Sequence, residues 1–246
     1  DLVPQPHPQT DAVLEALETA GQPVIRLRMG DQWDLGAEFL RWEFATAVAG
    51  AVLGINPFDE PNVQESKDNT KRLLEEFRKR GGLPEPPPEA SGDGVSVVGT
   101  PAATVGEAIT RFVEQVRVGD YVAIMVFLDP TPEVETPLRE IRDLLRDRLG
   151  VATTLGYGPR FLHSTGQLYK GGPANGAFIQ IVAVPQHDLP IPEEGYTFGT
   201  LFRAQALGDF EALRRRGRPL LRLELHGDPV DGLKRVLQML APAALR

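Results

Sequence analysis

Eight consecutive apolar residues occupy positions 121–128 and read Tyr-Val-Ala-Ile-Met-Val-Phe-Leu. A run of this kind, without alternating polar residues, is typical of a strand buried on both faces of a parallel sheet. Further strands are expected at 151–155, 177–184 and 219–225, and helices at 105–116, 137–149, 200–216 and from Val230 onward. Strands that alternate with helices predict an α/β fold, in which a parallel sheet is sandwiched by helices.

The residues before this region predict three helices and one strand. The helices are expected at 10–20, 34–53 and 63–80, and the strand at 23–29. A proline-rich, acidic stretch follows at 83–94 and is typical of a linker. We therefore expect three parts: residues 1–82 as the mostly helical end of one domain, a linker at 83–94, and a complete α/β domain at 95–246.

One sequence motif occurs twice with the same spacing. Leu14-Glu15-Ala16-Leu17 is followed by Gly21 and Pro23-Val24-Ile25-Arg26-Leu27, and Phe210-Glu211-Ala212-Leu213 is followed by Gly217 and Pro219-Leu220-Leu221-Arg222-Leu223. The repeat predicts that residues 1 to about 54 are the closing helix, strand and helix of an α/β domain whose beginning is missing, and that 95–246 is a complete second copy. The alternative is chance convergence of two helix-glycine-strand units.

Composition and charge exclude several classes of protein. The 246 residues carry a formal net charge of -8 and no cysteine. A negative protein repels nucleic acid and anionic membranes, and a chain without cysteine has no disulfide or thiolate metal site. No apolar run approaches the roughly 20 residues that span a bilayer, and no histidine or carboxylate spacing is typical of zinc. We expect a cytoplasmic protein without metal, nucleic-acid or membrane partners. Because it begins at Asp1 without a signal pattern, we also expect it to be cut from a longer chain.

Lys67 lies on the apolar side of the helix expected at 63–80. At about 3.6 residues per turn, one stripe of that helix contains Val63, Lys67, Thr70, Leu74 and Phe77. A lysine there either has a function or snorkels, so that its aliphatic part packs while its ammonium reaches water or a carboxylate such as Glu38 or Glu43. The pattern alone leaves both interpretations open.

His163 lies in a glycine-rich segment that follows the strand expected at 151–155. Ligands of open α/β sheets bind at the carboxyl ends of strands. A short helix expected at 159–170 would keep His163 within its first turns. The position makes His163 a candidate acid or base; the alternative is a capping or hydrogen-bonded surface histidine.

Two motifs resemble signatures of the glucose-6-phosphate isomerase family. Residues 54–67 read Gly-Ile-Asn-Pro-Phe-Asp-Glu-Pro-Asn-Val-Gln-Glu-Ser-Lys, which is similar to the family segment that ends at an active-site lysine. Residues 162–167 read Leu-His-Ser-Thr-Gly-Gln, which is similar to the segment around the family's ring-opening histidine. The lysine segment comes first here, an order that resembles the C-terminal part of transaldolase and glucose-6-phosphate isomerase fusions.

The resemblance implies a sugar-isomerase-type phosphosugar-binding fold and the interconversion of glucose 6-phosphate and fructose 6-phosphate through an enediol. It implies that Lys67 stands near the ring oxygen and that His163 moves the ring-opening proton, as the catalytic residues. It also implies substrate contacts from Glu60, Gln167 and Lys170, although the family has glutamine where this chain has Glu60. No cofactor is implied. The implied partners are a sugar phosphate and a missing N-terminal part of the same polypeptide.

Two other functions remain to be weighed against an isomerase. A non-catalytic phosphosugar-binding or scaffolding module would hold His163 too far from Lys67 to share one substrate. A hydrolase that uses Ser164 beside His163 is disfavoured, because adjacent helical residues do not face each other and no carboxylate is placed to orient the histidine.

Overall fold

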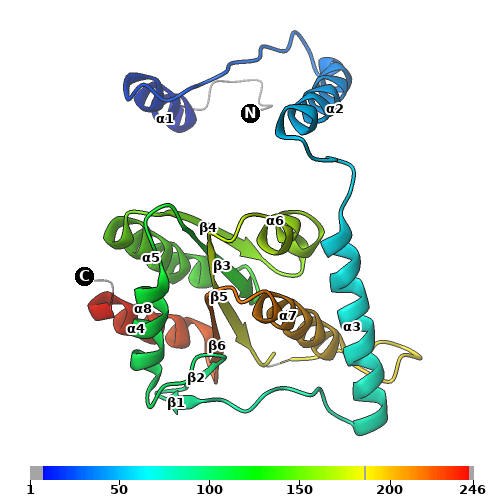
Figure 1. Cartoon of the computed structure of the whole chain (residues 1–246), viewed down its shortest axis with the longest axis vertical. Coiled ribbons are helices and arrows are strands. Elements are labelled where there is room, and N and C mark those ends of the chain that lie inside the picture. Colours follow the sequence, from blue (N-terminus) through cyan, green and yellow to red (C-terminus); the bar gives the residue numbers. More distant parts are fainter. Residues whose placement is uncertain (1–7, 186, 244–246) are drawn as a thin grey trace. The chain divides into compact units, whose positions relative to one another are not determined.

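The computed structural model describes residues 8–185 and 187–243, which divide into two compact units between Asp59 and Glu60. The first unit contains the helices α1 (Pro8–Thr19) and α2 (Asp34–Leu53). The second unit begins with α3 (Pro61–Arg80) and continues into a six-stranded sheet with its helices (Figure 1). No helix among the described residues is long and apolar enough to cross a membrane.

The sheet of the second unit has the strand order β1-β2-β6-β5-β3-β4. Its strands are β1 (Ala90–Gly92), β2 (Val95–Val98), β3 (Tyr121–Phe127), β4 (Ala152–Tyr157), β5 (Gly176–Ala183) and β6 (Leu220–Leu225). The four strands from β6 to β4 run parallel, and the β1–β2 hairpin joins β6 antiparallel. The predicted α/β class, with a mostly parallel sheet between helices, is confirmed.

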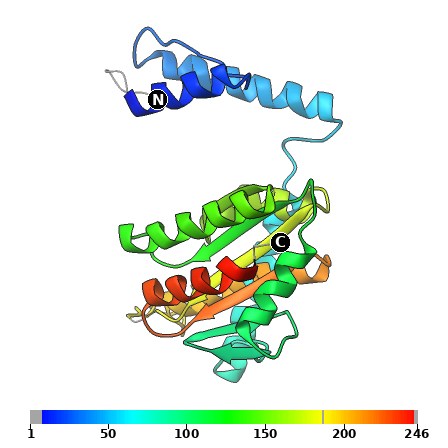
Figure 2. The ribbon, with the colours of Figure 1, turned by 90° about the vertical axis from the view of Figure 1, so that its left-hand side faces the viewer.

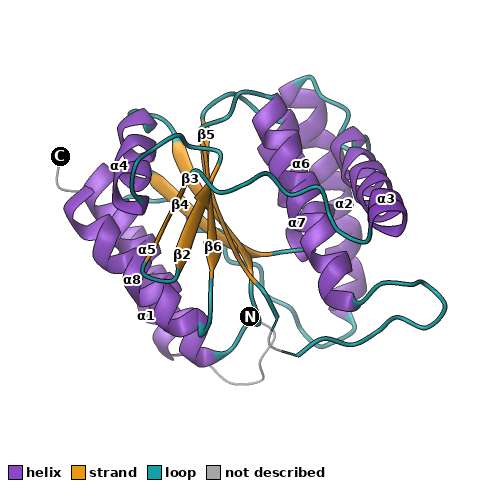
Figure 3. Cartoon of the chain, turned by 90° about the horizontal axis from the view of Figure 1, so that it is seen from below, coloured by secondary structure: helices purple, strands orange, loops and turns teal. Residues whose placement is uncertain are grey.

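Helices cover both faces of this sheet. They are α4 (Val105–Gln115), α5 (Pro132–Leu149), α6 (Thr165–Gly171), α7 (Phe198–Arg215) and α8 (Pro229–Ala243). Helices α4, α5 and α8 lie on one face, and α3, α6 and α7 on the other (Figures 2 and 3). Strand β5 shows why both faces are apolar: Ile179 and Ile181 point to the first layer, whereas Phe178 and Val182 point to the second. Full burial on two sides explains the unbroken apolar run.

The expected linker at 83–94 lies inside the second unit, because the two units divide between Asp59 and Glu60. Helix α3 belongs to the second unit: its Leu73 and Leu74 are buried in the same core as residues of α7. Residues 90–92 pair with 95–97 around Asp93 and Gly94, whose φ angles are 50° and 71°. An Asp-Gly turn with two positive φ angles is the signal of a tight hairpin. The prediction from sequence missed this hairpin because the prolines before it are typical of a linker.

The two copies of the sequence repeat share local structure but differ in strand pairing. Each helix is followed by a glycine with positive φ, 74° at Gly21 and 64° at Gly217. The second copy continues into β6, which pairs with β5 and β2. In the first copy, the strand expected at 23–29 forms no strand among the described residues, and Ile25 is 85% exposed. That strand prediction is wrong, because the described residues of the first unit include no other strand to accept its backbone hydrogen bonds.

Hydrogen exchange should distinguish the two copies. We expect the backbone amides of residues 23–27 to exchange without measurable protection, while those of 220–225 exchange slower by several orders of magnitude, since protection follows the free energy of local opening. Peptide-resolved deuterium uptake of the whole chain measures both segments in one experiment. Equal protection of the two segments would contradict the structure of the first unit.

Candidate functional site

Helix α3 positions Lys67 through an amphipathic pattern. Pro61 occupies the first turn, where its missing N–H removes no helical hydrogen bond. Gly81 ends the helix with a φ of 74°. The side that faces the second unit's core buries Val63, Ser66, Leu73 and Leu74. Lys67 follows the buried Ser66 and is exposed, so it lies at the border of the packed face.

The packing of α3 against α7 is close at Gly208. A Cβ at that position would lie 3.1 Å from the Cβ of Asn69. The side-chain amide of Asn69 donates to the carbonyl of Gly208 at 3.4 Å. Glycine therefore lets the two helix backbones approach, which fixes the height of α3 above the sheet.

The segment around His163 contains two short helices instead of the single one expected at 159–170. A 3-10 helix, η1 (Arg160–His163), ends at the histidine, and α6 begins at Thr165. Ser164 separates them with φ -151° and ψ -100°. His163 is therefore the last residue of one helix and not part of the first turns of a longer one. Its side chain is exposed, whereas Phe161 and Leu162 are buried.

Lys67 and His163 line the same cavity, which has a volume of about 450 Å³. The wall from α3 includes Ser66 and Thr70, and Gln205 of α7 completes the side toward the sheet. The resemblance to sugar-phosphate isomerases left open whether these two side chains share one pocket, and the fold brings both to the same cavity although they are far apart in sequence.

The cavity has a mixed charge in which two ammonium groups remain unpaired. Lys67 and Lys71 form no hydrogen bond or ion pair with the described residues. Arg78 is paired with Glu194 and lies 5.1 Å from the ring centre of Tyr196. The other carboxylate of the cavity belongs to Glu75. Two unpaired lysines on one helix give the wall from α3 a local positive charge in a protein that is negative overall.

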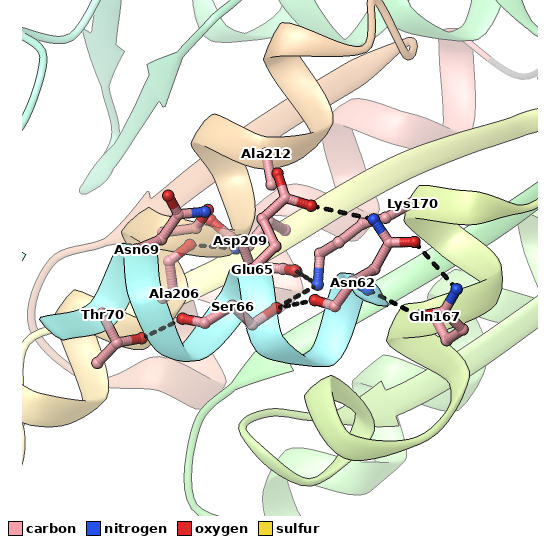
Figure 4. Close-up of polar contacts among 12 residues, drawn as sticks. Asn62, Glu65, Ser66, Asn69, Thr70, Gln167, Lys170, Ala206, Asp209 and Ala212 are labelled. Carbon is pink, nitrogen blue, oxygen red and sulfur yellow. Dashed lines mark hydrogen bonds and ion pairs between the residues drawn. The ribbon is translucent and has the colours of Figure 1, made fainter. Parts of the chain in front are cut away.

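A buried ion pair lies next to the cavity and joins three helices (Figure 4). Lys170 Nζ of α6 lies 2.5 Å from Asp209 Oδ1 of α7, and both side chains are at most 1% exposed. Lys170 also donates to Ser66 Oγ at 2.8 Å, and that hydroxyl donates to the carbonyl of Asn62 at 3.0 Å. Burial raises the pKa of Asp209, and the neighbouring Lys170 opposes the rise. Ser66 thus links the cavity wall to the buried pair.

A second polar contact joins α3 and α6 at the start of α3. The backbone N–H of Asn62 donates to Gln167 Oε1, and Gln167 Nε2 donates to Asn62 Oδ1, both at 3.0 Å. The Gln167 amide therefore satisfies one of the N–H groups that the first turn of a helix leaves without an intrahelical partner. This pair and the Lys170 cluster hold α6 against α3.

The three residues expected to contact substrate do not line the cavity. Lys170 is enclosed by Asp209 and Ser66, and both polar ends of the Gln167 amide are used by Asn62. Glu60 is exposed at the start of α3, where its carbonyl accepts from Val63 N–H. In this structure Lys170 and Gln167 support the positions of α3 and α6, because their polar atoms are already paired within the protein.

Glu65 fixes the outer side of α3 to the end of α7. Its carboxylate accepts from both Nη atoms of Arg216, at 3.0 and 2.7 Å, and from the side-chain amide of Asn62 at 3.0 Å. The hydrogen bonds from Arg216 are the main reason that the pKa of Glu65 is lowered to about 2. The charged form of Glu65 is therefore favoured in the folded state.

We expect Glu65→Gln to lower stability at neutral pH by no more than about 1 kcal/mol, since the pair is partly open to solvent. A lowered folded-state pKa contributes stability above the unfolded value of 4.5, and this contribution is lost as the pH falls toward about 2. Urea midpoints of wild type and variant should therefore converge over that range. Glu140→Gln, at an exposed position without a partner among the described residues, serves as the control. A difference in urea midpoint between wild type and Glu65→Gln that stays constant with pH would contradict the lowered pKa of Glu65.

Ser66 and Asp209 are the parts of this region that sequence reasoning missed. Asp209 lies in a stretch of α7 whose neighbours Leu207, Phe210 and Leu213 are all buried, and an acid there indicates a buried partner. Ser66 shares a helical face with Asn62 and Thr70, at intervals of four residues. Both signals were present, but neither names the partner.

The described residues place nothing beside His163 and Ser164 that would make a hydrolase. Ser164 Oγ contacts Thr165 Oγ1 at 3.5 Å, and no carboxylate forms a hydrogen bond or ion pair with His163 within residues 8–185 and 187–243. In the same part of the chain, no group of three histidine or carboxylate side chains is placed to hold a metal ion.

No protein-family model matches the chain. A search of solved structures finds a hypothetical protein from Thermus thermophilus with a TM-score of 0.49 and 20% sequence identity, over 57% of this chain and 39% of that one.

Curated relatives with local matches are glucose-6-phosphate isomerases. The enzyme of Rubrobacter xylanophilus is 42% identical over 64 residues, which is 24% of this chain and 14% of the relative. The enzymes of Streptococcus equi subsp. zooepidemicus and Campylobacter jejuni are 40% and 37% identical, over 26% and 27% of this chain. These matches span only 14–17% of the relatives' own lengths. The similarity relates about a quarter of the chain to glucose-6-phosphate isomerases.

Proposed function

We propose that this chain contributes an acid/base part of a sugar-phosphate isomerase site, of the type that interconverts glucose 6-phosphate and fructose 6-phosphate. The observation that carries the proposal is the shared cavity of Lys67 and His163. Two groups that act on the ring of one sugar must face the same ligand, and a volume of about 450 Å³ is within the range of small-molecule sites.

In this proposal His163 moves the proton that opens the sugar ring, and Lys67 stabilises the oxygen on which negative charge develops. A cation fixed beside that oxygen lowers the barrier because it needs no reorganisation when the charge appears. Lys71 adds positive charge to the same wall of the cavity, which suits an anionic substrate. The local similarity to glucose-6-phosphate isomerases supports an isomerase-related function of the chain. The roles of Lys67 and His163 rest on the two motifs that contain them.

Turnover also requires a base for the enediol step and a site for the phosphate. We propose that these come from polypeptide outside this chain, since the matches cover a small part of the length of the relatives. The exposed apolar side chains of α2 and the unpaired segment at 23–29 support a further domain that packs on the first unit.

The test measures isomerisation of fructose 6-phosphate by the 246-residue chain and by the longer polypeptide that this proposal implies, the complete polypeptide. Binding of fructose 6-phosphate is measured by calorimetry. Turnover by the complete polypeptide supports the proposal. Binding without turnover in both proteins would favour the non-catalytic phosphosugar-binding module instead. If the complete polypeptide shows no binding and no turnover, both functions are overturned.

A further inference from the structure

A second cavity, of about 840 Å³, opens where three parallel strands end. Its lining includes Phe127 and Ala183, the last residues of β3 and β5, and Asp228, which follows β6. The carboxyl edge of a parallel sheet is where α/β folds bind ligands, because the loops and helix starts converge there. The cavity borders the Lys67 and His163 cavity at Gln205 but contains neither of these two residues.

The walls of this second cavity are mainly apolar, and part of that surface faces solvent. Phe127 and Phe202 pack edge to face in its floor, with ring centres 5.3 Å apart. Three further lining side chains are large, apolar and more than half exposed: Val184 at 56%, Leu189 at 69% and Phe198 at 56%. A concave apolar surface of this kind gains free energy when a ligand removes it from water.

The permanently charged side chains of the second cavity at neutral pH are carboxylates. Asp129, Asp188 and Asp228 line it, and no lysine or arginine does so among the described residues; the remaining ionisable side chain of the lining is His187. Asp188 Oδ1 accepts from Gly199 N–H at 2.8 Å, and Asp228 Oδ1 accepts from Asp231 N–H at 3.0 Å. These two carboxylates already occupy the N-terminal ends of α7 and α8, so neither helix end is open to a phosphate. The side chain of Asp129 has no hydrogen bond or ion pair with the described residues.

We propose that this second cavity binds an organic cation with an apolar body, such as an aromatic or alkyl ammonium compound. The apolar body would cover the phenylalanine floor, and the ammonium group would meet Asp129. Aromatic faces attract cations as well, which adds to the preference for a positive ligand. A sugar phosphate is disfavoured, because it brings negative charge to three carboxylates and no counter-charge. This site is additional to the proposed isomerase site and does not depend on it.

Three probes of similar shape and different charge test the proposal: phenethylammonium, 2-phenylethanol and phenylacetate. Titration of the whole chain, followed by calorimetry and by amide chemical shifts, should rank their affinities in that order. We expect phenethylammonium to bind about five- to tenfold tighter than the alcohol, from the charge pair and the aromatic faces together. The shift changes should centre on residues 184, 198 and 202, and added fructose 6-phosphate should not displace the ammonium.

Asp129→Asn should lower the affinity of phenethylammonium toward that of the alcohol, because it removes the unpaired carboxylate and keeps the shape; the contribution of the aromatic faces should remain. Asp143→Asn is the matched control on α5, outside the cavity, and should change nothing. The proposal is overturned if phenylacetate binds as tightly as the ammonium, if Asp129→Asn has no effect, or if no probe binds at millimolar concentration. Association of the chain through this surface in place of probe binding would also overturn it.

Discussion

Under the proposed isomerase function, Lys67→Ala and His163→Ala are each expected to lower the isomerisation rate of the complete polypeptide by about a hundredfold or more, as the loss of a charge-stabilising or acid/base group typically does. Both side chains are exposed to one cavity, and neither is buried in the core. Their replacement should therefore leave folding intact. Loss of His163 removes the ring-opening proton transfer, and loss of Lys67 removes the charge that stabilises the oxygen. Initial rates with fructose 6-phosphate, measured across pH, check the prediction.

Lys79→Ala is the control for this experiment, because Lys79 is an exposed lysine of the same helix that does not line the cavity. Full activity of this variant would show that the loss of a positive charge from α3 is not in itself enough to lower the isomerisation rate. If Lys67→Ala is inactive and His163→Ala keeps wild-type activity, His163 has no catalytic role. If both variants are fully active, the shared cavity is not the isomerase site.

Lys170→Met is expected to destabilise the protein by about 3–5 kcal/mol, the typical cost of leaving a buried charge without its partner. Lys170 and Asp209 are both buried, and Lys170 Nζ is the cation beside Asp209 Oδ1. Ser66 would lose its hydrogen-bond donor at the same time. Chemical unfolding at neutral pH measures the effect, with Lys79→Met as the exposed control.

The pH dependence of the Lys170→Met variant identifies the cause. Burial raises the pKa of Asp209 above its usual 3.8, and an acid with a raised folded-state pKa loses stability as the pH rises from the unfolded value toward the folded one. The deficit of the variant should therefore be larger at about pH 8 than at about pH 5. Lys170→Met combined with Asp209→Leu should recover most of the loss, since buried pairs are often replaceable by apolar residues of similar size. Near wild-type stability of Lys170→Met alone would refute this account.

The helices and central strands could be predicted from sequence because their apolar spacing reports which faces are buried. The run at 121–128 became β3, and the amphipathic pattern at 63–80 became most of α3. The strand at 23–29 could not be judged in the same way. Its sequence matches that of β6, but a strand exists only where a neighbour supplies backbone partners, and local composition does not report that neighbour.

The candidate site was predictable only in part, for the same physical reason. The motifs identified Lys67 and His163, and they also suggested Gln167 and Lys170, which lie on the same short segment as His163. On α6 the side chains diverge: Lys170 points into the protein toward Asp209, whereas His163 precedes the helix and remains exposed. A motif fixes which residues are near one another along the chain, not which of them face solvent.

By itself the sequence determined the α/β class and the order of its central strands and helices, and it singled out Lys67 and His163 as candidate site residues. These properties follow from local periodicity and short motifs, which act over a few residues. Only the tertiary structure decided that Lys67 and His163 share a cavity. It also decided that Asn62 forms hydrogen bonds with Gln167 across 105 positions and that Lys170 forms a buried ion pair with Asp209. Such contacts depend on how whole helices pack on the sheet and on one another. The close approach of α3 to α7 at Gly208 and the pairing of buried charges favour the observed packing of these helices.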